Sequence, residues 1–151
     1  MEVSKYNKEK KILGAYKKGG EKVTDYDYIK EAKEFYKEAV EEFEKGYSAN
    51  DRILMRDACE KGWGAIVQAT NALFVKKGVR DLPKSHRERR RLLRELSKRH
   101  KDLQQLYLVD RFMARDDALH MRAFYNGDIE PEEIRDNFEK VKRYIEDIEK
   151  L

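Results

Sequence analysis

Apolar side chains recur three or four positions apart along most of this chain, the spacing that lines one face of an α-helix. The pattern predicts helices over about 24–46, 51–77, 85–98, 102–125 and 131–151. No stretch shows the sustained alternation of apolar and polar residues that is typical of strands. The pattern therefore indicates an all-α protein, a bundle of about five helices.

Local signals place several helix boundaries. Thr24 with Asp27, and Ser85 with Glu88, have the spacing of an N-terminal capping box. Pro131 suits the first turn of the last helix, where the missing N–H has no partner to lose. A break is expected between the third and the fourth helix.

A tryptophan between two glycines stands out in the second predicted helix. Gly62 and Gly64 each cost about 1 kcal/mol relative to alanine inside a helix. We therefore expect a neighbouring helix to cross close by, with Trp63 as a core or interface anchor. The same periodicity places Ile53 and Met113 on buried faces.

Charge is distributed unevenly along the chain. Residues 1–23 carry seven lysines without a clean hydrophobic period, which predicts a basic N-terminal arm in front of a single bundle at 24–151. Residues 84–101 hold nine Lys or Arg against two Glu, whereas 25–45 and 128–150 are each net acidic. The basic helix can bind a phosphate backbone or complement an acidic neighbour, and both interpretations stay open.

Several classes of protein are excluded by composition. The longest apolar run is far shorter than the roughly 20 residues that span a bilayer, so we expect no membrane segment. The first residues lack the apolar core of a secretory signal, and Cys59 is the single cysteine, which together indicate a cytoplasmic protein. Asp117 and His120 have metal-ligand spacing, but no second acid–histidine pair completes a site, so we expect no metal and no cofactor.

One cluster could carry chemistry. It begins at Arg115, continues through Asp116 and Asp117 to His120, and ends at Tyr125. The spacing Arg-x-x-x-x-His, with a polar residue after the arginine, resembles the signature of HEPN ribonuclease domains, which lies on a late helix of an α-bundle.

Further segments are similar to the archaeal PaREP-type branch of the HEPN superfamily, from about residue 25 to the end of the chain. They are Trp63-Gly64-Ala65, Ala118-Leu119-His120, Phe124-Tyr125 and Pro131-Glu132-Glu133-Ile134. The resemblance implies a metal-independent endoribonuclease whose active site forms across a homodimer. It also implies a toxin or defence role, with a nucleotidyltransferase-type antitoxin as a possible partner.

Such a reaction needs specific side chains. His120 can act as base or acid near neutral pH, and Arg115 offers a planar cation for phosphate oxygens. Asp116 or Asp117 can orient the imidazole, and Tyr125 is a possible supporting residue. Five residues of α-helix separate Arg115 and His120 by about 140°, so two helices meeting at a two-fold interface would clasp a phosphate better than one.

Three interpretations remain open, the last of which is a purely structural helical adaptor. In the first, His120 and Arg115 cleave RNA that docks on the basic helix. In the second, His120 is a structural residue of a non-catalytic HEPN module that binds nucleotide, RNA or a protein partner. The candidate RNA-binding residues are Arg87, Arg90, Arg91, Arg94 and Arg99.

Overall fold

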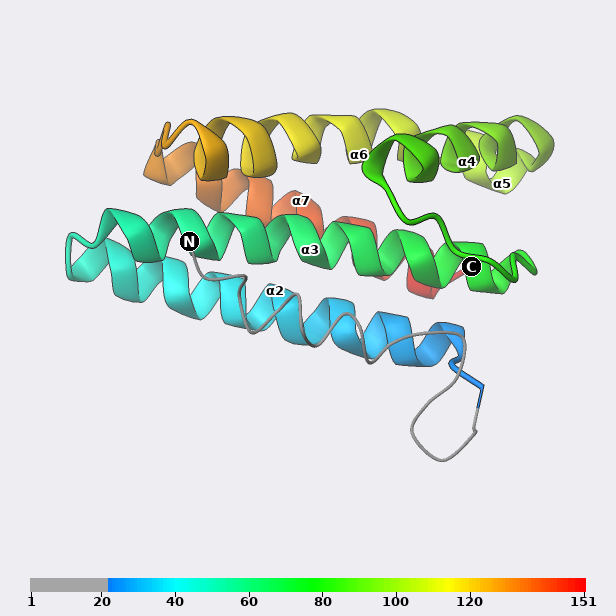
Figure 1. Ribbon diagram of the computed structural model, residues 1–151, viewed down its shortest axis with the longest axis horizontal. Coiled ribbons are helices and arrows are strands. Elements are labelled where there is room, and N and C mark those ends of the chain that lie inside the picture. Colours follow the sequence, from blue (N-terminus) through cyan, green and yellow to red (C-terminus); the bar gives the residue numbers. More distant parts are fainter. Residues whose placement is uncertain (1–21) are drawn as a thin grey trace.

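The computed structural model describes residues 22–151. This part of the chain folds into six α-helices and one π-helix, without a β-sheet, which confirms the predicted all-α bundle. Figure 1 shows α2 (Asp25–Ser48) and α3 (Arg52–Lys76) side by side, with α7 (Pro131–Glu149) behind α3. The predicted arm at 1–23 lies almost entirely outside the described residues, and Val23 already belongs to the core.

The remaining helices form the upper layer in Figure 1. They are α4 (His86–Arg99), α5 (Lys101–Gln104), α6 (Leu108–Arg115) and the π-helix η1 (Asp116–Tyr125). No helix of residues 22–151 is long and apolar enough to cross a membrane.

The predicted boundaries follow from local hydrogen bonds. Thr24 and Asp27 form a reciprocal capping box at the start of α2, as predicted. The Ser85 hydroxyl accepts from the Glu88 N–H at 3.1 Å, while the Glu88 carboxylate accepts from the N–H of Lys84 rather than from that of Ser85. Pro131 begins α7, which confirms its first-turn position.

The close crossing predicted in the second helix is confirmed at Gly62. A Cβ atom at this position would lie 2.7 Å from Phe138 of α7 and 3.4 Å from Leu119 of η1. Only a glycine allows α3 to approach both helices this closely. Trp63 next to it is 1% exposed and packs against the ring of Phe112 at 5.0 Å, so it is a core anchor.

The prediction of one continuous helix over 102–125 is wrong. The chain turns after α5, and Tyr107 takes a left-handed backbone conformation with φ of 51°. Leu103 and Leu108 are both buried, yet five residues of α-helix would point them about 140° apart. The turn lets both side chains enter the core, and it divides the predicted helix into separate segments.

Two predicted core positions are also wrong. Ile53 is 73% exposed and Met113 is 42% exposed. Ile53 lies in the first turn of α3, and Met113 faces outward because its neighbour Phe112 is the residue of α6 that packs on Trp63. The 3.6-residue spacing identifies a stripe, but the edge of that stripe depends on where the neighbouring helices lie.

Candidate functional site

The candidate residues lie on a π-helix, a rare form in which backbone hydrogen bonds join residues five apart. At its C-terminal end the Asn126 N–H donates to the Met121 carbonyl at 3.0 Å, which is this wider pattern. The α-helical separation of about 140° assumed for Arg115 and His120 therefore does not hold in η1. π-Helical turns occur frequently at functional sites.

Two arginines of α3 hold the end of η1. The Arg56 guanidinium donates to the carbonyls of Phe124 and Tyr125, both at 2.8 Å, and Arg52 donates to the carbonyl of Gly127 at 2.8 Å. These carbonyls have no partner within the helix, because the last turn of any helix leaves its acceptors unpaired. The wide helix is thus anchored to α3, the helix that also carries the partner of His120.

His120 is oriented by a carboxylate from α3. Its Nδ1 atom lies 2.8 Å from an oxygen of Glu60, and its side chain is 11% exposed. With the Nδ1 proton directed at Glu60, the neutral imidazole carries its lone pair on Nε2, where it can accept a proton. Sequence reasoning missed Glu60, and its spacing of three from Trp63, which puts both on one face of α3, is the signal that could have found it.

Aromatic rings surround the imidazole of His120. The ring of Trp63 lies 5.7 Å away, that of Tyr125 lies 4.8 Å away, and that of His86 lies 5.2 Å away. Tyr125 is 56% exposed, so its ring forms the solvent side of this group. His86 is a histidine that the sequence did not mark as a site residue.

Arg115 faces a different part of the bundle. It lines a hollow of about 450 Å³ between α6 and α7, together with Asp110, Arg111, Ala114, Lys140 and Arg143. Within residues 22–151, no hydrogen bond or ion pair joins Arg115 to His120, whose Nδ1 atom is paired with Glu60.

Arg115 is a largely buried cation. The residue is 8% exposed, and its Nε atom has no hydrogen-bond partner among residues 22–151. Burial, and then the nearby charge of Arg111, lower the pKa of Arg115. A buried donor without a hydrogen-bond partner carries a desolvation cost.

The two candidate aspartates have separate surroundings. Asp117 pairs with Arg122 at 2.9 Å, and Arg122 also binds Glu133 of α7 at 2.9 Å. Burial raises the pKa of Asp116, although the charges of His120 and Arg90 oppose the shift. The carboxylate hydrogen-bonded to His120 comes from Glu60.

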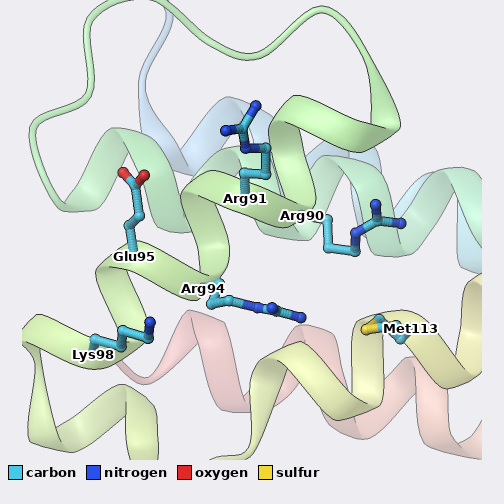
Figure 2. Close-up of a pocket in the computed structure, with 6 residues that line it drawn as sticks. All are labelled: Arg90, Arg91, Arg94, Glu95, Lys98 and Met113. Carbon is cyan, nitrogen blue, oxygen red and sulfur yellow. The ribbon is translucent and has the colours of Figure 1, made fainter.

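The basic helix α4 forms one wall of a second hollow, of about 610 Å³. Figure 2 shows Arg94 extending from α4 toward Met113 of α6, with Lys98 beside it. The residues that line this hollow are Arg90, Arg91, Arg94, Glu95, Lys98 and Met113. Four cations against one carboxylate make it attractive to phosphate groups.

The other arginines of α4 are placed differently. Arg87 and Arg99 are exposed and do not line the hollow. Arg89 is 7% exposed, because its guanidinium donates inward to the Pro83 carbonyl at 3.0 Å and to Asn71 at 3.3 Å. The basic sequence therefore divides into an outer face that can bind anions and one arginine that belongs to the core.

The possible metal ligands and the cysteine thiol among residues 22–151 form no shared cluster. No group of three or more His, Cys, Asp or Glu side chains in this range is placed to hold a metal ion. Burial raises the pKa of the Cys59 thiol to about 12, so the thiolate required of a nucleophile is scarce at neutral pH.

Comparison with known proteins adds one finding. No curated protein and no solved structure matches the chain. The model of the archaeal PaREP1/PaREP8 family matches residues 27–145, which span α2 through most of α7 and include all of η1. Because this match covers far more than half of the sequence, the chain belongs to the archaeal PaREP1/PaREP8 family.

Proposed function

We propose that this protein is a metal-independent endoribonuclease of the HEPN type, with His120 as its proton-transferring residue. The observation that carries the proposal is the pairing of His120, on a π-helix, with Glu60. The basic helix α4 contacts His120 through the ring of His86. A carboxylate on Nδ1 keeps the imidazole in the tautomer that accepts a proton at Nε2, and it stabilises the imidazolium that then forms.

The reaction that fits this arrangement is a transphosphorylation within RNA. Nε2 of His120 takes the proton of a 2′-hydroxyl, and the 2′ oxygen forms a bond to the adjacent phosphorus. The bond from phosphorus to the 5′ oxygen breaks, and the electron pair leaves with that oxygen. The imidazolium returns its proton, directly or through water, to the 5′ oxygen. The products are a 2′,3′-cyclic phosphate and a 5′-hydroxyl end.

Arg115 fits the role of the cation that stabilises charge on the phosphoryl oxygens. In one chain it lines the hollow between α6 and α7 and forms no hydrogen bond or ion pair with His120 among the described residues. A homodimer would let Arg115 of one protomer serve the phosphate at His120 of the other, which is the assembly that the HEPN resemblance implies. A nucleotidyltransferase-type antitoxin is the partner that the same resemblance implies.

RNA would dock along the hollow of α4. Its cations neutralise phosphates and release counterions, so the affinity should fall steeply as the salt concentration rises. Replacing Arg90, Arg91 and Arg94 by glutamate should weaken binding for all RNA sequences alike. Loss for one sequence only would show that this face reads bases, and no loss would assign it to protein partners.

The test is cleavage of a labelled mixed-sequence RNA in excess chelator. The wild type should cleave RNA, leave DNA intact and produce 2′,3′-cyclic phosphate ends. His120→Ala should lower kcat by about 10²-fold or more, and Glu60→Gln should lower it less, because the imidazole remains but loses its charged partner. Cleavage that disappears with chelator, or that survives His120→Ala unchanged, would refute the proposal.

A second candidate function is a non-catalytic module that binds RNA, nucleotide or a protein. The observation that favours it is that no hydrogen bond or ion pair joins Arg115 to His120 among residues 22–151. Under this alternative, RNA binding and its salt dependence persist, no RNA is cut, and His120→Ala lowers stability rather than activity.

A further inference from the structure

The hollow between α6 and α7, called here the α6–α7 hollow, is lined mainly by cations. The two helices pack against each other, and the space between them has a volume of about 450 Å³. Its cations are Arg111 and Arg115 of α6 with Lys140 and Arg143 of α7, and its carboxylate is that of Asp110. This excess of positive charge stands out because the segment 128–150, which contains most of α7, is net acidic.

Helix geometry places these cations in two pairs. Arg111 and Arg115 are four residues apart on α6, and Lys140 and Arg143 are three residues apart on α7. Side chains at these spacings lie on the same face of a helix. Because all four line the same hollow, the two pairs reach it from different helices, and an anion in the hollow would meet positive charge from both.

The two arginines of α6 differ in their partners. Arg111 donates to the Leu106 carbonyl at 3.1 Å and pairs with Asp147 at 2.9 Å. Arg115, one turn later, is 8% exposed, and its Nε atom has no hydrogen-bond partner among residues 22–151. Burial and the charge of Arg111 both disfavour the charged form of Arg115 and lower its pKa. A bound anion would offset both effects, because it supplies the opposite charge.

The two cations of α7 are placed to contact a ligand. Lys140 and Arg143 are both exposed. Neither takes part in the ion pairs that α7 forms within residues 22–151. Their charges are therefore not already engaged by a carboxylate of the described part of the chain, although several acids lie on the same helix.

We propose that the α6–α7 hollow binds a phosphate group, with Lys140 and Arg143 as its contacting residues and Arg115 as a buried cation beside them. A phosphate suits this set because guanidinium and ammonium groups donate several charge-assisted hydrogen bonds to its oxygens. The volume of the hollow lies within the range of about 300–1,000 Å³ that is typical of small-ligand sites. The phosphate can belong to RNA or to a free phosphorylated molecule. Only the RNA source rests on the proposed function, since the site itself requires binding and no cleavage.

Pyrophosphate tests the site directly. It is titrated by calorimetry into the variant in which the three arginines of the α4 hollow are replaced by glutamate, so that the other basic hollow does not contribute. Adding Lys140→Glu and Arg143→Glu should lower the affinity about tenfold or more, because two charged contacts are lost. The matched control is Lys142→Glu, an equal charge change at an exposed position of α7 outside the hollow, which should leave the affinity nearly unchanged. Circular dichroism should confirm that all variants are folded.

A 2′-O-methyl RNA identifies the source of the phosphate, because it has no 2′-hydroxyl to attack and reports binding apart from cleavage. If RNA occupies the hollow, Lys140→Glu with Arg143→Glu in the otherwise native chain should weaken RNA binding and reduce the slope of log affinity against log salt by about 1. Loss of pyrophosphate binding with unchanged RNA affinity would identify a free phosphorylated ligand.

Two results would overturn the inference. One is a double variant that binds both pyrophosphate and RNA as the unaltered hollow does, which would assign these cations to an acidic protein surface. The other is an equal loss in Lys142→Glu, which would show that only the overall charge matters. A wild type that binds these probes but never cleaves RNA would refute the ribonuclease and leave the phosphate site in place.

Discussion

Replacing Gly62 by alanine tests how closely the helices that carry the site are packed. The new Cβ atom would lie 2.7 Å from Cε1 and 3.2 Å from Cδ1 of Phe138, and 3.4 Å from Cδ1 of Leu119. Carbon atoms in contact prefer separations of about 3.5–4.0 Å, so the nearest approach is short by about 1 Å. Phe138 has little room to move, because it is 3% exposed and its ring packs against Phe43 at 5.7 Å.

Two effects of opposite sign decide the result. Alanine gains about 1 kcal/mol over glycine in a helix interior. Overpacking a tight core costs typically 1–3 kcal/mol, and a fixed ring places Gly62→Ala toward the upper end of that range. We expect a net loss of about 1–2 kcal/mol in the free energy of unfolding, which lowers the melting temperature by roughly 2–8 °C for a chain of this size.

Thermal and urea unfolding followed by circular dichroism measure this change. The double variant Gly62→Ala with Phe138→Leu removes most of the ring and should recover part of the loss, giving a coupling energy of about 1 kcal/mol or more. A Gly62→Ala protein that is more stable than the wild type would refute the close contact. Equal effects of the substitution with and without the Phe138 ring would refute it as well.

Two further predictions concern charges at the candidate site. Arg115→Met removes a cation that is 8% exposed and whose Nε atom lacks a hydrogen-bond partner among residues 22–151, so it should raise the free energy of unfolding by about 1 kcal/mol or more in urea titrations. The same variant should weaken RNA binding. A destabilised variant would contradict the cost of burying Arg115. Burial raises the pKa of Asp116, so the folded state favours the protonated acid, and its contribution to stability is lost as the pH rises through that pKa. Asp116→Asn should therefore be more stable than the wild type at pH 7, and the advantage should vanish below the unfolded aspartate pKa of about 3.9, as urea midpoints at both pH values would show.

The parts of the fold that depend on neighbours in sequence could be predicted. Thr24 and Asp27, only three residues apart, form the cap of α2, and the fixed ring of Pro131 suits the first turn of α7. Both boundaries therefore depend on local sequence. The apolar stripes identify which helices exist, because a helix must bury one face wherever it packs. The free-energy cost of placing Gly62 inside a helix could also be recognised in the sequence. It indicated the close approach of α3 to Phe138 and Leu119 that the structure contains.

Tertiary contacts decided the rest. The turn at Tyr107 exists because Leu103 and Leu108 must both reach the core, and the end of the π-helix is held by Arg52 and Arg56 from another helix. These contacts join residues that are distant in sequence, so no regular spacing along the chain predicts them.

The same division applies to the candidate site. Arg115 and His120 could be singled out by their spacing. The carboxylate of Glu60, the ring of His86 and the burial of Arg115 instead depend on three other helices that pack around η1 and α6. Periodicity specifies which residues face inward. Which side chains meet there is set by the angles and depths at which the helices pack, and those follow from the shapes of side chains distant in sequence.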